Sequence, residues 1–227
     1  MDKAAKMTTE NFIPFEYDQV EQKESLERVK SFYSDINKRR SLRVFSDKPV
    51  DREVIEYEIK SAGTAPSGAH EQPWTFCAVS NPEIKAKIRE SVEKEEYENY
   101  HGRMSEDWLE DLKVAGTDWN KPFLETAPWL IIVFRKTYDL EDGVKSKNYY
   151  VQESVGLAAG MLLTAIHRAG LVSLTHTPSP MNFLSKVLNR PENEKPFLLI
   201  PVGYPADDAE VPDIQRKPLE DISVFYE

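Results

Sequence analysis

Short apolar segments separated by amphipathic ones constrain the fold of this chain most strongly. Runs that are almost continuously apolar are typical of strands buried in a sheet, and they cover residues 74–80, 127–136, 171–175 and 196–204. Between these runs, apolar residues recur with helical spacing or form a long helix that is apolar almost all round. Helices alternating with short buried strands predict a layered α/β or α+β domain.

Residue chemistry marks where the predicted helices begin and end. Asp51 is a candidate N-cap for a helix that stops at Gly63. Asn81, followed by Pro82 at the first helical position, opens a second helix. The long apolar helix starts near residue 151 and ends near Gly170. A further short helix is expected over residues 181–188, whereas residues 101–122 show no clear period and are expected to be irregular.

Composition excludes several classes of function. The chain has 227 residues and a formal net charge of −10, which disfavours general binding to nucleic acid or to an anionic membrane. One cysteine and four scattered histidines give no spacing that suits a metal site, so no metal is expected. The longest apolar run is about 12 residues and too short to cross a bilayer. We therefore expect a soluble, cytoplasmic protein.

A cluster of arginines stands out against this acidic background. Residues 38–45 read KRRSLRVF and place Arg39, Arg40 and Arg43 around Ser41. Guanidinium groups match the geometry of phosphate, and the serine hydroxyl could bond a phosphate oxygen between them. A solvated basic surface is the alternative. A second basic cluster, at residues 215–217, could reach the same anion.

A second candidate site combines a carboxylate, a phenol and an ammonium group. Glu96 and Tyr100 are four residues apart on a predicted helix and therefore share a face. With Lys121 they would suit the zwitterion of an amino acid, although a solvated acidic helix is the plainer interpretation. Thr175 and Thr177 follow a predicted strand, where hydroxyls often only stabilise a turn.

Motif searches exclude some enzyme classes and suggest one contact surface. The chain contains no dinucleotide-binding G-x-G-x-x-G, no P-loop and no G-x-S-x-G. Gly156 and Gly160 have the small-xxx-small spacing that allows close helix packing, and they could lie at a dimer seam.

Several stretches in the same order resemble one family, the iodotyrosine deiodinases of the FMN-dependent nitroreductase superfamily. The resemblance runs from about residue 38 to residue 218 and rests on RRSLR, AGTAPSGAHEQPWTF, EEYENYHGRM, TDWNKP, AGLVSLTHTP, NEKPFLLIPVGYP and VPDIQRKPL. It implies an α+β layered domain with a central mixed sheet flanked by helices, in an intertwined homodimer with FMN at the subunit interface. It also implies a domain over 31–227, a lid at about 97–121 and a C-terminal arm at about 206–227. Residues 1–30 are polar and without strong periodicity, so they are expected to form an extension.

The resemblance also implies the site residues. FMN would be bound by Arg39, Arg40, Ser41, Arg43, Pro66, Ser67, Thr175, His176, Thr177 and Arg216. Two of the implied roles are catalytic, since Thr177 would donate toward flavin N5 and favour one-electron steps, while the Ala69 backbone N–H would bind the substrate phenolate. The substrate-binding residues would be Ala69, at the phenolate, and Glu96, Tyr100 and Lys121, at the zwitterion.

The implied activity is reductive dehalogenation of mono- and di-iodotyrosine to tyrosine and iodide. Electrons would come from NADPH through a separate reductase, because no nicotinamide fingerprint is visible. The alternatives are a general NAD(P)H-dependent nitroreductase or quinone reductase, and a halotyrosine-binding flavoprotein without turnover. Vertebrate members are membrane-tethered, whereas no anchor is expected in this chain. At His176 those members have threonine, which changes a side-chain contact but leaves a backbone contact intact.

Overall fold

The chain divides into two compact units, Met1–Lys38 and Arg39–Glu227. The computed structural model describes residues 12–141 and 143–227. The described part of the first unit contains helix α1 (Gln22–Ile36), which buries none of its residues. The extension expected over residues 1–30 therefore holds most of a helix, and its residues 1–11 lie outside the described part.

The second unit is built on an antiparallel sheet. Among the described residues, β1 (Trp74–Val79), β2 (Trp129–Lys136), β6 (Glu194–Gly203) and β5 (Val172–Ser173) form one sheet in the order β1-β2-β6-β5. Each neighbouring pair is antiparallel, and the parallel pairing at its edge is an isolated bridge between Ser41 and Ser173. The α+β layered class is confirmed, but the strands themselves are antiparallel rather than mixed.

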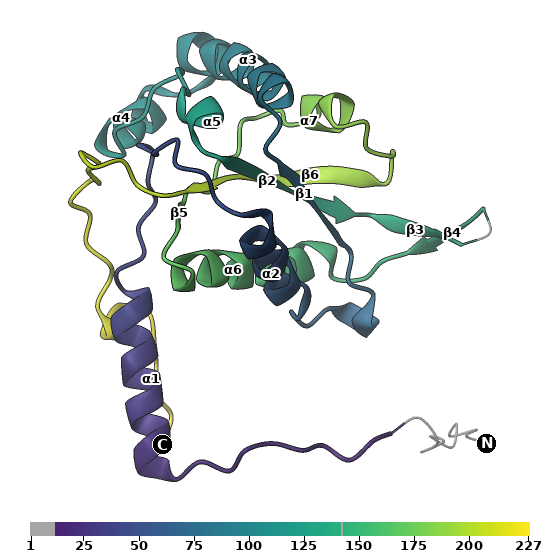
Figure 1. The fold of residues 1–227 in the computed structure, drawn as a ribbon, viewed down its shortest axis with the longest axis vertical. Coiled ribbons are helices and arrows are strands. Elements are labelled where there is room, and N and C mark those ends of the chain that lie inside the picture. Colours follow the sequence, from purple (N-terminus) through teal and green to yellow (C-terminus); the bar gives the residue numbers. More distant parts are fainter. Residues whose placement is uncertain (1–11, 142) are drawn as a thin grey trace. The chain divides into compact units, whose positions relative to one another are not determined.

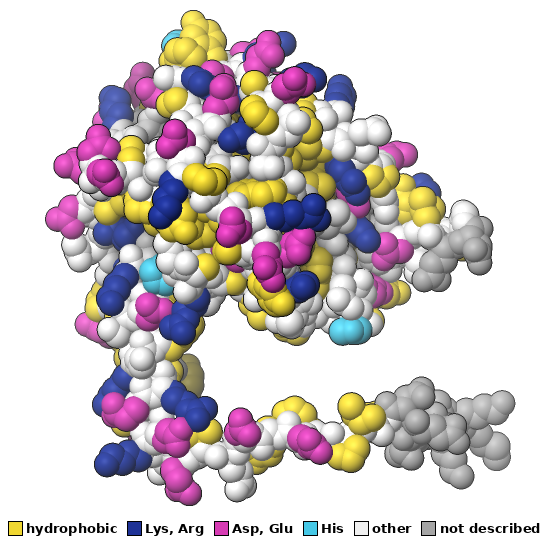
Figure 2. Space-filling model, viewed as in Figure 1, with side chains coloured by type: hydrophobic (Ala, Val, Ile, Leu, Met, Phe, Trp, Pro, Cys, Tyr) yellow, Lys and Arg dark blue, Asp and Glu magenta, His cyan; other side chains and the backbone are white. Residues whose placement is uncertain are grey.

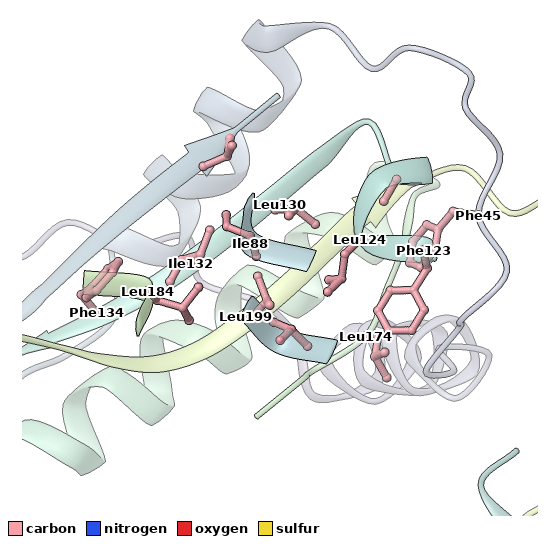
Figure 3. Packing of buried hydrophobic residues seen from close by; sticks show 13 residues of the cluster. Phe45, Ile88, Phe123, Leu124, Leu130, Ile132, Phe134, Leu174, Leu184 and Leu199 are labelled. Atoms are coloured by element: carbon pink, nitrogen blue, oxygen red, sulfur yellow. The ribbon is translucent and has the colours of Figure 1, made fainter. Parts of the chain in front are cut away.

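Alternate residues of β2 supply the two layers of the core. Leu130, Ile132 and Phe134 point to one face, where Ile88, Leu124 and Leu184 pack against them (Figure 3). Ile131 and Val133 point to the opposite face and pack under α2 and α6. Because side chains of a strand alternate between its faces, one almost wholly apolar strand can be buried on both sides.

The helices lie on the two faces of this sheet (Figure 1). Helices α2 (Arg52–Gly63) and α6 (Val151–Arg168) cover one face, and α3 (Pro82–Glu98), α5 (Phe123–Thr126) and α7 (Phe183–Val187) cover the other. Asn81 caps α3 as predicted, since its side chain accepts a hydrogen bond from the Ile84 backbone N–H at 3.0 Å. Short 3-10 helices cover Gly68–His70 and Leu219–Asp221.

Two regions differ from the sequence expectation. Residues 101–122 are not irregular throughout: a π-helix covers Asn99–Arg103 and α4 covers Glu106–Val114, whereas residues 115–122 are irregular as expected. The Ser105 hydroxyl caps α4 by accepting from the Trp108 backbone N–H. In addition, β3 (Tyr138–Glu141) and β4 (Val144–Lys147) form a separate hairpin that the apolar pattern did not indicate.

Charge is distributed unevenly over the surface. Acidic side chains gather in the part of the surface where α4 lies (Figure 2), since this helix carries acidic residues in its first turn. In the part of the chain that the structure describes, no helix is both long enough and apolar enough to span a bilayer.

Candidate active site

The arginine cluster lines a cavity of about 280 Å³, which we call the arginine pocket. Its walls are formed by Arg39, Arg40, Ser41, Arg43, Ala115, Pro212, Ile214, Gln215 and Arg216. The Leu42 backbone N–H donates to the Ser173 carbonyl at 3.1 Å, which fastens the arginine stretch to the end of β5. The two basic clusters of the sequence therefore meet in one place, as the anion hypothesis requires.

Two guanidinium groups of this pocket are fixed by backbone carbonyls. Arg40 donates to the Pro212 carbonyl, and Arg216 donates to the Arg39 carbonyl at 2.8 Å. The pKa of Arg39 is lowered, first by burial and then by the neighbouring charges of Arg216 and Arg40. Neighbouring cations whose charges lower the pKa of Arg39 create a field that favours an anion, and their forked donors fit a phosphate.

A second cavity, of about 200 Å³, lies between α3, α4 and the end of β5. We call it the lysine pocket. Its walls are formed by Arg43, Glu96, Tyr100, Met104, Trp108, Leu112, Thr117, Lys121, Phe123, Leu174, Thr175, His176 and Thr177. The zwitterion set predicted from sequence is thus assembled with the threonine–histidine–threonine stretch, from segments far apart in the chain.

Lys121 and Glu96 form a buried ion pair in this cavity. Their charged atoms are 3.6 Å apart, and their side chains are only 2% and 8% exposed. Burial raises the pKa of Glu96 and lowers that of Lys121, and each partner's charge opposes the shift of the other. The Lys121 ammonium also donates to the Thr117 hydroxyl at 2.9 Å and to the Asp118 carbonyl.

Tyr100 and His176 complete the polar lining of the lysine pocket. The Tyr100 hydroxyl donates to the Thr117 carbonyl at 3.3 Å, and burial raises the pKa of the phenol. Burial and the charges of Lys121 and Arg43 lower the pKa of His176 to about 3, so its ring is neutral at ordinary pH. Its Nε2 is buried and has no hydrogen-bond partner among the described residues.

Arg43 belongs to the walls of both cavities. Its pKa is lowered by burial, against the opposing influence of Tyr100. A ligand that fills both cavities, or two ligands in contact, would therefore meet the same guanidinium group.

The remaining predicted site residues lie elsewhere. Pro66, Ser67 and Ala69 follow α2, and none of them is among the described residues that line the two pockets. Ala69 is exposed and has a φ of 50° within a short 3-10 helix, and the Gly68 backbone N–H donates to the Ser154 hydroxyl of α6 at 3.3 Å. One copy of the chain does not bring this loop together with the arginines.

Sequence reasoning missed the apolar half of the lysine pocket. Trp108 and Leu112 of α4 line it, with Met104, Phe123 and Leu174. A signal was present, because Trp108 and Leu112 are four residues apart and share a helical face. It was overlooked because the segment was expected to be irregular.

Comparison with known proteins places these pockets in context. The family model described as "Nitroreductase family" matches residues 36–204. An iodotyrosine deiodinase of Haliscomenobacter hydrossis is 62% identical over 95% of this chain and 97% of its own length. Human iodotyrosine deiodinase 1 is 47% identical over 93% of this chain and 74% of its own.

A solved structure of the same family has a similar fold. A crystal structure of oxidized iodotyrosine deiodinase bound to FMN and 3-iodo-L-tyrosine superimposes with a TM-score of 0.74. It is 32% identical in sequence, and the match covers 86% of this chain and 98% of that one.

Proposed function

Since the chain belongs to the nitroreductase family, and within it to the iodotyrosine deiodinases, we propose that it catalyses the FMN-dependent reductive deiodination of iodotyrosines. The observation that carries this proposal is the buried Lys121–Glu96 pair beside the arginine pocket. A general nitroreductase has no need of a buried, charge-balanced pair at its substrate site, whereas an amino-acid substrate does.

The arginine pocket fits the phosphate of FMN. Arg39, Arg40 and Arg216 would supply charged donors, and Ser41 a hydroxyl, to the phosphate oxygens. When bound, FMN supplies the electrons that reduce the carbon–iodine bond. Arg43, which borders both cavities, would lie between the phosphate side and the substrate side.

The lysine pocket fits the zwitterion of the substrate. Glu96 would accept from the ammonium, Lys121 would donate to the carboxylate, and Tyr100 would close the pocket over both. Exchanging the Glu96–Lys121 contact for two contacts with the ligand keeps every buried charge paired, which limits the cost of desolvation. Trp108 and Leu112, both on α4, would cover the ligand and exclude water.

The phenol end of the substrate would be bound as phenolate. The phenol of tyrosine has a pKa of about 10, and an iodine atom on the ring lowers that pKa. The iodinated substrate therefore ionises more readily near neutral pH. The backbone N–H of Ala69 would hold this oxygen, and Thr177 would donate a hydrogen bond toward flavin N5. Thr175 and His176 would line the flavin on the same side.

A second copy of the chain would bring Pro66, Ser67 and Ala69 to these pockets. This homodimer is supported by an exposed face of α6 with Gly156, Leu157 and Gly160, where the two glycines leave open space for a close neighbour. A separate NADPH-dependent reductase would supply the electrons.

Anaerobic turnover tests this function. The FMN-loaded protein, reduced with dithionite and given 3-iodotyrosine, is expected to release iodide and tyrosine in equal amounts. Tight ligand binding without products would indicate a binding protein, and it would overturn the proposal. Glu96→Gln should weaken the activity strongly, whereas a general nitroreductase would be indifferent to this change and would oxidise NADPH without a partner.

A further inference from the structure

The proposed substrate contact of Lys121 depends on how this residue is held. Lys121 lies outside any helix, between α4 and α5, so no helical hydrogen bond fixes its backbone N–H. Glu96, by contrast, is fixed on α3. From this geometry we propose that Arg89 and Glu93 are positioning residues for substrate binding, which clamp the backbone at Lys121 onto α3. This inference rests on the proposed function.

Glu93 forms the centre of the clamp. Its Oε1 accepts a hydrogen bond from the Lys121 backbone N–H at 2.8 Å and another from Arg89 Nε at 2.7 Å. Glu93 is 20% exposed and Arg89 is 27% exposed, so both contacts are partly shielded from water. A charged acceptor bonded to a backbone N–H is stronger than a neutral one, and it fixes the position of the main chain.

Arg89 reaches residues on both sides of Lys121. Its Nη2 donates to the Asn120 side-chain oxygen at 3.2 Å, and its Nη1 donates to Glu125 at 3.2 Å. An isolated surface ion pair contributes little, but a guanidinium with three partners joins a loop, a helix and α3 into one unit.

The clamp lies on the same face of α3 as Glu96. Residues 85, 89, 93 and 96 are three or four positions apart and therefore form one stripe of the helix. Lys85, a turn earlier, donates to the carbonyls of Glu125 at 2.7 Å and Ala127 at 2.8 Å. The segment over residues 120–127 is thus attached to α3 at successive turns, ending with Glu96 opposite Lys121.

The consequence is a defined spacing between the two charges that receive the zwitterion. Glu96 is placed by α3, and Lys121 is placed by its backbone bond to Glu93 on the same helix. Glu93 bonds the main chain of Lys121. Removing the Glu93 carboxylate would therefore keep the charge of the Lys121 ammonium but would no longer fix where that charge lies. Loss of position lowers the affinity for a ligand that must meet both charges together.

Three variants and a matched control test the clamp in the FMN-loaded full chain. Glu93→Ala removes the acceptor, Glu93→Gln keeps an acceptor but weakens the pairing with Arg89, and Arg89→Met removes the guanidinium. Glu90→Ala is the control, because Glu90 is an exposed glutamate on the same helix. For each protein, kcat/KM is measured with 3-iodotyrosine and with 2-iodophenol, which lacks the zwitterion.

The ratio of the two kcat/KM values is the deciding quantity. Glu93→Ala is expected to lower it about tenfold, Arg89→Met about fivefold and Glu93→Gln about threefold, with Glu90→Ala at the wild-type ratio. A ratio within about twofold of wild type in folded Glu93→Ala overturns the inference. Should Glu93→Ala not fold, Arg89→Met decides by the same threshold.

Amide hydrogen exchange separates this inference from the proposed function. In the FMN-loaded protein without substrate, the Lys121 amide is expected to exchange about tenfold faster in Glu93→Ala than in wild type. An unchanged rate overturns the clamp whatever the activity. Wild-type protein that releases no iodide overturns the proposed function, while the exchange result still tests the clamp.

Discussion

The arginine pocket and the lysine pocket hold charge in opposite ways. The arginine pocket gathers cations from the start and the end of its unit, and their guanidinium groups bond to backbone carbonyls. In the lysine pocket, Lys121 pairs with Glu96 and both side chains are almost fully buried, with Arg43 in the wall that this cavity shares with the arginine pocket. The first arrangement leaves a surplus of positive charge, whereas the Lys121–Glu96 pair is balanced in itself.

This difference matches two kinds of ligand. A phosphate brings net negative charge and keeps part of its contact with water, so a partly open pocket with surplus cations suits it. A zwitterion brings both signs, and a buried site can accept it only if each sign meets its opposite. Substituting a charged residue in either pocket should therefore weaken the binding of the ligand that this pocket matches.

The largest effect is expected from Lys121→Met, which unbalances the lysine pocket. Glu96 would remain buried without its partner, and the substrate carboxylate would lose its donor. We expect the affinity for 3-iodotyrosine, measured by quenching of flavin fluorescence, to fall about 100-fold, or ~2.7 kcal/mol. FMN affinity should change little, and an equal loss for both ligands would contradict the separation of the two pockets.

A smaller and complementary effect is expected from Arg39→Ala in the arginine pocket. One charged donor to the phosphate is lost, so the Kd for FMN should rise about tenfold, or ~1.4 kcal/mol. The Kd for riboflavin, which has no phosphate, should stay at the wild-type value. Titration of the apoprotein with each flavin checks this, and a matching loss for riboflavin would show that Arg39 does not serve the phosphate.

The smallest effect concerns His176, which must stay neutral beside two cations. Its pKa is about 3 in the folded protein and near 6.5 as a free side chain. The unfolded chain therefore binds the extra proton, so the stability that His176 contributes is full above pH 6.5 and is lost as pH falls toward 3.

Replacing this histidine tests the sign of the effect. When the pH is lowered from 7.5 to 5.5, the free energy of unfolding should fall by ~1 kcal/mol less in His176→Thr than in wild type, as measured by urea unfolding. Parallel losses in the two proteins would mean that the ring of His176 is already accessible to protons in the folded state.

Much of the fold could be predicted from sequence, because its core strands are continuous apolar runs and its core helices have apolar residues at helical spacing. The strand at β2 and the helices α2, α3 and α6 all follow from apolar runs and helical periods, and the Asn81 cap of α3 is confirmed. Asp51 stands at the N-cap position of α2 as predicted, but its side chain makes no cap hydrogen bond. Helix α4 was missed because it buries none of its residues and is rich in charge. The β3–β4 hairpin was missed for a similar reason, since β4 is wholly exposed.

The two pockets were predictable to different degrees. The arginine pocket depends on a local cluster whose composition was visible without any fold. The pairing of Glu96 with Lys121 joins residues 25 positions apart, and the pattern within one helix could not show that they meet. The Arg89–Glu93 contacts with residues 120 and 121 lay beyond sequence reasoning, because charged residues on a helix give no sign of a distant partner.

The guanidinium of Arg43 stands in the wall that the two cavities share. If the first ligand to bind orders the Arg43 side chain, the free energy of that ordering no longer contributes when the second ligand binds. By thermodynamic reciprocity, cofactor and amino acid must then alter each other's dissociation constant by the same factor. If Arg43 contacts both ligands, retention of the flavin is linked to the supply of substrate through this one side chain.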